Sequence, residues 1–314
     1  MIINLKHLEF SLTTKCNSQC IYCQADASPS CKEVMDVRDA CNYLIEACAV
    51  SNLESFMVFG GEPMLYPERA IAIFRKASQL EIPQVEMLTN GVWGKDKAEV
   101  EKLAKKLKGA GLNTLGISVD AFHLQYIPLD YPRNAAEASI KAGIENVAWN
   151  VAVIESLDAL NEYDAKTNQI LKTLQPVGIE AHIHKVVCVG RATQTLREYF
   201  QQTSLEGPCE GEPPIGNVLV SPESICIEPS GSVDVCWHLP LGNAKVKPLS
   251  QMISKYDWRN SIITEILVKE GPIGLLKLAK VHKHRFKLHN YFAKCHLCIE
   301  TRKALKPHHP EAYS

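Results

Sequence analysis

Apolar runs of strand length alternate with segments of helical periodicity along the first two thirds of the chain. The apolar runs lie at 8–13, 55–61, 85–91, 114–120, 146–154 and 179–190, and the helical segments at 37–50, 67–80, 95–108, 134–142 and 158–174. Strands that alternate with helices through short connections indicate a parallel sheet. We therefore expect an α/β fold curved as a partial (β/α)6 TIM-like barrel. In such folds the functional site lies at the C-terminal ends of the strands.

The pattern changes near residue 204. Residues 206–216 are rich in Pro and Gly and mark a boundary. Residues 225–236 predict a β-hairpin with a Ser-Gly turn, and helical segments follow at 249–256 and 261–292. We expect a barrel over 1–203, a small hairpin-plus-helix domain over 204–300, and a flexible tail over 301–314.

Composition and charge are those of an ordinary globular protein. The chain has 314 residues, of which 46% are hydrophobic, and a net charge of -1, which gives no general attraction to nucleic acid or membranes. The first residues, MIINLKHLEF, do not resemble a signal peptide, so we expect a cytoplasmic protein. Residues 277–306 carry nine Lys or Arg and one acidic residue. This basic segment is either a solvated helix face or a docking surface for an acidic partner.

The cysteines supply the first chemical evidence. Twelve are many for a reducing compartment, where clustered cysteines bind metal or carry chemistry. Cys16, Cys20 and Cys23 follow the first strand with the spacing C-x3-C-x2-C. A structural zinc ion needs four ligands, usually in spaced pairs, and no histidine lies nearby. Three thiolates suit a cubane iron–sulfur cluster whose fourth iron is open to another ligand.

This three-cysteine loop resembles that of the radical S-adenosylmethionine (SAM) superfamily, over about residues 8–192. Other matching residues lie at the ends of later strands or inside the fifth. The resemblance implies that SAM chelates the open iron and is bound by Tyr22, Gly60, Gly61, Glu62, Asn90, Ser118, Asp120 and Asn150. Glycines permit close approach of the backbone to a ligand. Each of these residues taken alone has an alternative role as a turn cap or core hydrogen-bonding group.

The resemblance also implies the reaction. One electron from the cluster cleaves SAM to methionine and a 5′-deoxyadenosyl radical, which removes a hydrogen atom from a substrate at the barrel mouth. A flavodoxin- or ferredoxin-type reductant would supply the electron. The rival class, a non-catalytic iron–sulfur electron carrier or a zinc-binding module, has no need of the predicted SAM-binding residues.

A second set of four cysteines lies in the last third of the chain. Its C…C…C-x2-C series resembles the "twitch" form of the SPASM extension, and implies that an auxiliary [4Fe–4S] cluster is held by Cys209, Cys236, Cys295 and Cys298. A structural zinc ion is the alternative, because four thiolates suit both metals. Cys226 on the hairpin is a candidate substitute ligand.

The other cysteines have less defined roles. Cys41 and Cys48 share one helix face and are expected in the core, and Cys31 is unassigned. Cys188 is expected at the end of the sixth strand, on the same face as His182 and His184. A thiol there is a candidate hydrogen-atom donor to a substrate radical, although a packed core thiol is the favoured interpretation.

The layout of the whole chain is most similar to epipeptide-type peptide epimerases. That resemblance implies a ribosomally made peptide as substrate, with a separate peptide-recognition protein as a candidate partner. In those enzymes a second cysteine follows the hairpin cysteine and supplies the hydrogen atom, whereas Trp237 follows Cys236 here. Unless Cys188 or Cys226 serves instead, oxidation or cross-link formation is expected rather than epimerisation. A small molecule such as a sugar or cofactor precursor is the alternative substrate.

Overall fold

The computed structural model describes residues 3–209 and 218–310. Its centre is a nine-stranded sheet with the order β6-β5-β4-β3-β2-β1-β7-β8-β9. The first six strands are parallel to one another: β1 (His7–Ser11), β2 (Ser55–Phe59), β3 (Gln84–Thr89), β4 (Thr114–Ser118), β5 (Asn146–Val153) and β6 (Ala181–Lys185). The predicted α/β fold with a partial TIM-like barrel is confirmed. The sheet is open, with β6 and β9 at its edges.

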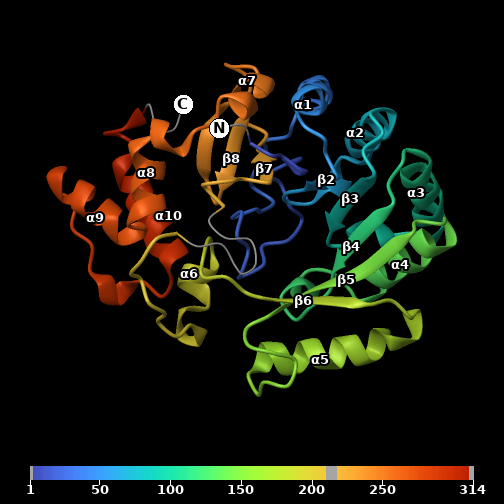
Figure 1. Cartoon of the computed structure of the whole chain (residues 1–314). Helices are drawn as coiled ribbons and strands as arrows, with labels where there is room; N and C mark the ends of the chain where they lie inside the picture. Colours follow the sequence, from blue (N-terminus) through green and yellow to red (C-terminus); the bar gives the residue numbers. More distant parts are fainter. Residues whose placement is uncertain (1–2, 210–217, 311–314) are drawn as a thin grey trace.

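Five helices follow the first five strands and cover one side of the sheet (Figure 1). They are α1 (Val37–Val50), α2 (Pro67–Gln79), α3 (Lys97–Gly109), α4 (Asp130–Lys141) and α5 (Glu162–Leu174). The buried Phe10 of β1 points toward them, with its ring 6.3 Å from Tyr43 of α1 and 4.9 Å from Phe56 of β2. Side chains alternate along a strand, so Glu9 and Ser11 point to the opposite, inner side. That inner side and the strand ends carry the polar residues of the site.

The predicted hairpin is confirmed, and it extends the same sheet. Its strands are β7 (Ser224–Ile227) and β8 (Ser232–Cys236), and β7 pairs in parallel with β1. Gly231 makes the turn with φ +90°, a value that glycine adopts without strain. A further strand, β9 (Leu239–Asn243), was not expected. Its sequence LPLGN contains Pro and Gly and no β-branched residue, so its propensity for a strand is low.

Three C-terminal helices pack around a second apolar cluster. They are α8 (Ile262–Lys269), α9 (Pro272–Val281) and α10 (Lys294–Leu305). The buried residues of α7 (Leu249–Ser254) belong to the main core, and the short α6 (Ala192–Thr195) precedes the hairpin. The cluster contains Leu219, Val235, Leu239, Ile263, Leu267, Leu275, Ala279 and Leu305. Figure 1 shows α8, α9 and α10 together, beyond the hairpin and away from α1 to α4.

Two predictions about the end of the chain were wrong. The expected helix over 261–292 is interrupted at Gly271, where φ is +70° and the next residue is proline. The tail was expected to be flexible from residue 301, but residues 301–305 belong to α10 because Thr301, Arg302 and Leu305 are buried. Residues 311–314 lie outside the described part. None of the helices within the described ranges is long and apolar enough to cross a membrane.

Candidate functional site

The three-cysteine loop directly follows β1. Cys16 and Cys20 are buried and Cys23 is partly exposed. Burial raises the pKa of Cys16 to about 11, and the charges of Glu62 and Cys23 contribute to this rise. Burial also raises the pKa of Cys20, assisted by the charges of Asp120, Cys16 and Cys23. The three thiols are therefore close enough to influence one another electrostatically, as ligands of one cluster must be.

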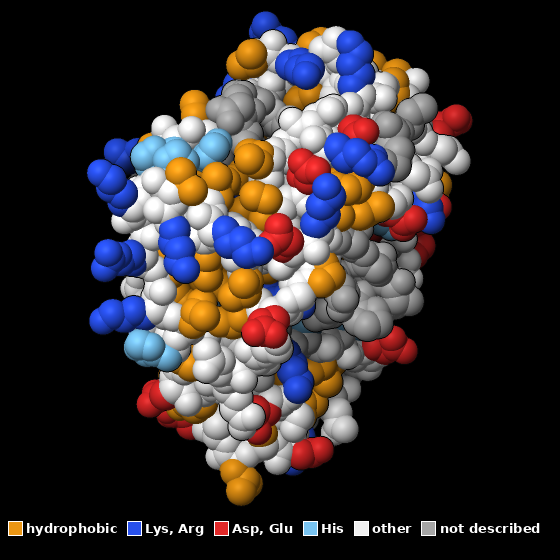
Figure 2. Space-filling model, turned by 60° about the vertical axis from the view of Figure 1, so that its left-hand side comes forward, with side chains coloured by type: hydrophobic (Ala, Val, Ile, Leu, Met, Phe, Trp, Pro, Cys, Tyr) orange, Lys and Arg blue, Asp and Glu red, His pale blue; other side chains and the backbone are white. Residues whose placement is uncertain are grey.

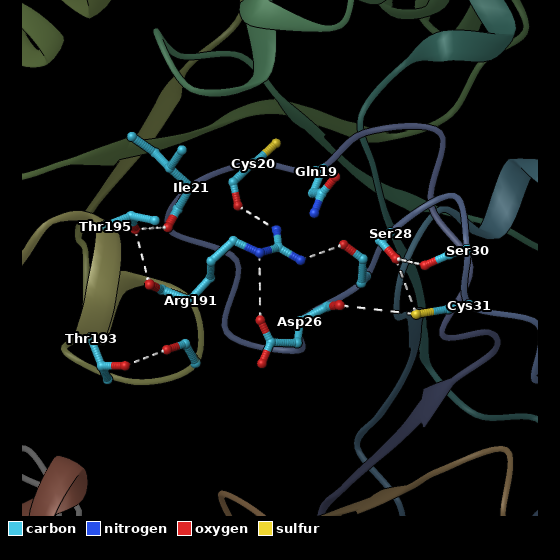
Figure 3. Close-up of polar contacts among 12 residues, drawn as sticks. Gln19, Cys20, Ile21, Asp26, Ser28, Ser30, Cys31, Arg191, Thr193 and Thr195 are labelled. Carbon is cyan, nitrogen blue, oxygen red and sulfur yellow. Dashed lines mark hydrogen bonds and ion pairs between the residues drawn. The ribbon is translucent and has the colours of Figure 1, made fainter.

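The segment after β6 holds this loop in place. Figure 3 shows the Arg191 guanidinium reaching across the loop, where it donates hydrogen bonds to the carbonyls of Cys20 at 2.7 Å and Ala27 at 2.9 Å. It also lies 3.5 Å from the Asp26 carboxylate. The backbone N–H of Arg191 donates to the Cys23 carbonyl at 3.0 Å. Arg191 thus fixes the path of the loop from its second cysteine to Ala27, beyond the third.

Two neighbours of Arg191 add to this contact. The Thr195 hydroxyl donates to the Ile21 carbonyl. At Gly190, where φ is +57°, a Cβ atom would lie 2.5 Å from the Cys23 carbonyl oxygen. Only glycine permits this approach without a shift of the backbone. No local pattern in the sequence indicates this segment, because its link to the loop spans 171 residues.

The turn after β2 packs against the other side of the loop. A Cβ atom on Gly61 would lie 2.1 Å from the Lys15 carbonyl oxygen. The N–H of Gly61 donates to the Thr13 carbonyl at 2.6 Å, and that of Glu62 to the Lys15 carbonyl at 2.9 Å. Gly60 adopts φ +131° beside the same strand end. The two glycines therefore form a cradle in which the loop backbone lies immediately before Cys16, and any side chain on them would collide with that backbone.

Glu62 joins the ends of β2 and β3. Its carboxylate is fully buried and accepts hydrogen bonds from the Met64 N–H at 2.9 Å, the Thr89 hydroxyl at 2.6 Å and the Asn90 N–H at 2.8 Å. The Asn90 side chain in turn lies 3.8 Å from the Cys16 sulfur. In this structure Glu62 organises the strand ends, and its contact with SAM stays a prediction.

Asp120, after β4, forms a pair with a histidine that the sequence analysis missed. The buried carboxylate accepts backbone hydrogen bonds from Phe122 at 3.0 Å and Ala152 at 3.2 Å. The His123 Nδ1 lies 2.9 Å from each carboxylate oxygen. The Tyr22 ring lies 5.6 Å from the His123 ring and 5.0 Å from that of Phe122. One local feature of the sequence indicates this pair: His123 lies three residues after Asp120, whose carboxylate follows the end of β4.

Ser118 and Asn150 lie side by side on β4 and β5, in register, and Asn150 is in register with His182 of β6. Residues in register across a sheet point to the same face. Ser118 is buried and Asn150 partly exposed. The structure thus brings together the predicted SAM-binding residues of β4 and β5, in a row that continues onto His182.

The four predicted auxiliary cysteines also gather. Burial raises the pKa of Cys209 to about 12, and the charges of Cys236, Cys298 and Cys295 add to this rise. Cys209, Cys236 and Cys298 pack against the second apolar cluster. Cys226 lies elsewhere, on β7, with its sulfur 4.0 Å from the Glu228 carboxylate.

One arginine joins this cysteine group to the hairpin. The Arg302 Nε donates to the Cys298 sulfur at 3.3 Å, and its guanidinium also donates to the carbonyls of Trp237 and His238. Within residues 3–209 and 218–310, no three His, Cys, Asp or Glu side chains are close enough to hold a single metal ion. Cubane ligands differ from such a set, because each cysteine binds a different iron.

Cys188 lies away from the position expected for it. The strand β6 ends at Lys185, so Cys188 belongs to the following loop. Its sulfur is buried and lies 3.7 Å from the Nδ1 atom of His296 in α10. In the sequence, His296 lies between the auxiliary cysteines Cys295 and Cys298. Burial raises the pKa of its thiol to about 11, and the charge of Cys295 contributes to the rise.

A cavity of about 330 Å³ lined mainly by polar residues lies beside the cluster loop and α10. Its walls come from the end of β1 and the cluster loop, from the hairpin, and from α10. The lining includes Ser11, Thr13, Thr14, Ala25, Glu228, Asp234, His238, Ile299, Arg302 and Lys303. Burial raises the pKa values of Glu228 and Asp234.

An open parallel α/β barrel with three cysteines on the loop after its first strand is typical of a class of iron–sulfur enzymes. The model of the Radical SAM superfamily matches residues 10–167, half of the chain, and the protein belongs to this superfamily.

The relatives found are distant. The GTP 3′,8-cyclase of Clostridium acetobutylicum is 21% identical over 206 residues, which cover 61% of this chain and 59% of that protein. A probable GTP 3′,8-cyclase of Methanococcus maripaludis is 22% identical over 190 residues, 57% of this chain and 61% of that protein. The match thus spans about three fifths of these relatives. The crystal structure of BtrN in complex with AdoMet and 2-DOIA is similar over 85% of this chain and 88% of that one, with a TM-score of 0.46 and 13% identity.

Proposed function

We propose that the protein is a radical SAM enzyme with a second, auxiliary [4Fe–4S] cluster, and that its substrate lies between the two clusters. The observation that carries this proposal is the polar cavity of about 330 Å³. It is bounded by Thr14 and Ala25 on either side of the first cysteine group, and by Arg302, which contacts Cys298 of the second. Its volume is at the small end of the range for ligand pockets.

The residues at the first site fit a cluster and SAM. Cys16, Cys20 and Cys23 would hold three irons, and the close packing of Gly60 and Gly61 against the loop fixes its position immediately before Cys16. When bound, the cluster and SAM supply one-electron cleavage and a carbon-centred radical. The protein's own task is to fix the loop, through Arg191 and the glycine turn, and to position the cosubstrate.

The remaining predicted contacts come from the ends of β4 and β5 and from the loop itself. The buried Asp120 holds His123, and Tyr22 of the loop packs against the rings of Phe122 and His123. We propose that this group and the Ser118–Asn150 row bind the ribose and carboxylate of SAM. Asn90, beside the Cys16 sulfur, would bind the part of SAM nearest the iron.

The second cysteine group supports the auxiliary cluster. Four thiols that influence one another, three of them partly buried against an apolar cluster, suit a closed four-thiolate site. The hydrogen bond from Arg302 to Cys298 is of the kind that tunes the potential of such clusters. A structural zinc ion is the competing hypothesis.

Iron counting separates these two hypotheses. In a Cys16→Ala, Cys20→Ala, Cys23→Ala variant, anaerobic reconstitution should leave about four irons per chain, and an added Cys298→Ala change should remove them. Zinc in place of iron in the triple variant would refute the auxiliary cluster and leave the radical SAM site in place.

We further propose that the reaction is a net oxidation or cross-link rather than an epimerisation. Epimerisation needs a hydrogen-atom donor, and the residue after Cys236 is Trp237. Cys188 packs against α10, and neither Cys188 nor Cys226 is among the described residues that line the cavity. Mass spectrometry of the product in D₂O tests this: loss of two hydrogens supports oxidation, and incorporation of one deuterium at an otherwise unchanged mass would refute it.

For the substrate, we propose a ribosomally made peptide as the first candidate, on the sequence resemblance to peptide epimerases alone. A small molecule is the second candidate, because the curated relatives are named GTP 3′,8-cyclases. The cavity would hold a short stretch of a peptide or one compact metabolite. A short open reading frame beside the gene, whose peptide is modified by the purified enzyme, would support the first candidate. Turnover of a sugar or cofactor precursor in its place would support the second.

A further inference from the structure

Four histidines near the end of the chain form a cluster that lies outside the radical SAM site. His282 follows α9 and His284 comes two residues later, while His308 and His309 follow α10. The rings of His282 and His308 are stacked, with centroids 4.1 Å apart and an interplanar angle of 15°. Figure 2 shows histidines adjoining one another on this side of the molecule, with Lys and Arg side chains beside them.

The ring nitrogens of this cluster form two pairs. The Nε2 atoms of His282 and His309 are 3.1 Å apart, and those of His284 and His308 are 3.2 Å apart. In each pair one histidine comes from the segment after α9 and the other from the segment after α10.

These separations suit two ligands of one metal ion. Zn–N bonds of about 2.0–2.1 Å in a tetrahedral site place two nitrogens roughly 3.3 Å apart. Imidazole is neutral at slightly alkaline pH, so its lone pair can bind a metal, and it suits zinc, copper and nickel. A hydrogen bond between two imidazoles has a similar length and is the competing explanation for each pair.

We propose that this cluster binds divalent transition metal ions such as Ni²⁺ or Zn²⁺, each Nε2 pair acting as a two-nitrogen chelate completed by water. The pair is the unit of the site, since no three ligands in the described ranges are close enough for one ion. The nearby Lys280, Lys283 and Lys306 oppose a cation, so binding depends on the imidazole–metal bonds.

The placement gives the metal a structural effect. Each pair bridges the ends of α9 and α10, and α10 carries Cys295 and Cys298. A bound ion would therefore tie the C-terminal end of α10 to α9 and restrict the helix that carries two of the auxiliary cysteines.

The test is nickel binding by the iron-reconstituted protein, measured anaerobically by equilibrium dialysis at pH 7.5, with the cysteines already occupied by iron. We expect at least one nickel per chain, and none when all four histidines are replaced by Asn. The variants His282→Asn with His309→Asn, and His284→Asn with His308→Asn, assign the pairs. His289→Asn, an exposed histidine outside the cluster, is the matched control and should bind nickel like the unmodified protein.

Equal nickel binding by the fourfold variant and the unmodified protein would overturn the proposal. So would less than one nickel per chain in the unmodified protein, a result that does not depend on whether any variant folds. The expected structural effect has its own measurement: nickel should slow tryptic cleavage after Arg302 and Lys303 in the unmodified protein and leave it unchanged in the fourfold variant.

Discussion

Arg191 holds the cluster loop through groups that can be removed one at a time. Its side chain is only 15% exposed and donates to two loop carbonyls, those of Cys20 at 2.7 Å and Ala27 at 2.9 Å. In Arg191→Met the side chain keeps its length and most of its apolar contacts but has no donor. Two buried carbonyls would then lose their partners.

The structure gives the size of the expected effect. A hydrogen bond from a charged donor contributes about 1.5–3 kcal/mol. Two such bonds, partly replaced by water in the variant, predict a loss of roughly 3 kcal/mol in the free energy of unfolding. The Asp26 side chain is 70% exposed, so its ion pair with Arg191 should contribute less than about 1 kcal/mol.

Two assays measure this difference. Urea unfolding of the iron-free protein, followed by circular dichroism, should show a much larger loss for Arg191→Met than for the matched control Asp26→Asn. Iron release from the reconstituted protein to a chelator should be faster in Arg191→Met, and intermediate in Arg191→Lys, because lysine retains the charge but not the two-pronged donor geometry. Unchanged stability and iron release in Arg191→Met would refute the assigned role.

Three further predictions concern other parts of the site. Gly61→Ala should abolish SAM cleavage, because its Cβ would lie 2.1 Å from the Lys15 carbonyl oxygen. The control Gly109→Ala should leave cleavage unchanged, because no atom lies within 4 Å of its Cβ. Normal turnover by Gly61→Ala would refute the role of the glycine cradle. His123→Gln should raise the KM for SAM about tenfold at unchanged iron content, since one charge-assisted hydrogen bond to Asp120 is lost. An unchanged KM would assign a purely structural role to the Asp120–His123 pair. Cys188→Ala should still consume SAM and give the same product, because the thiol packs against His296; a changed product would identify Cys188 as the hydrogen-atom donor and refute the proposed oxidation.

Local patterns were sufficient for most elements of the barrel. The helix expected over 37–50 has those bounds in the structure, because its apolar positions face the sheet and the Asp36 carboxylate caps its first N–H groups. The three-cysteine loop and the glycine turn were equally evident from spacing. The break at Gly271-Pro272 had its own local signal, a positive-φ glycine before a proline that begins α9.

Contacts across long sequence separations could not be inferred in this way. Arg191 and Cys20 are separated by 171 residues, and Cys188 and His296 by 108. No local periodicity indicates that the loop after β6 closes over the first cysteine group, or that it places Cys188 against α10. These contacts depend on the fold of the whole sheet, which places the segment after β6 and the hairpin beside the same loop.

The most direct test of the account is the cleavage of SAM itself. Anaerobically reconstituted protein, reduced with dithionite and supplied with SAM, should form 5′-deoxyadenosine, and replacement of Cys16, Cys20 and Cys23 by Ala should abolish it while the iron of the second cysteine group remains. Absence of 5′-deoxyadenosine from protein whose first cluster is assembled and reduced would contradict the account.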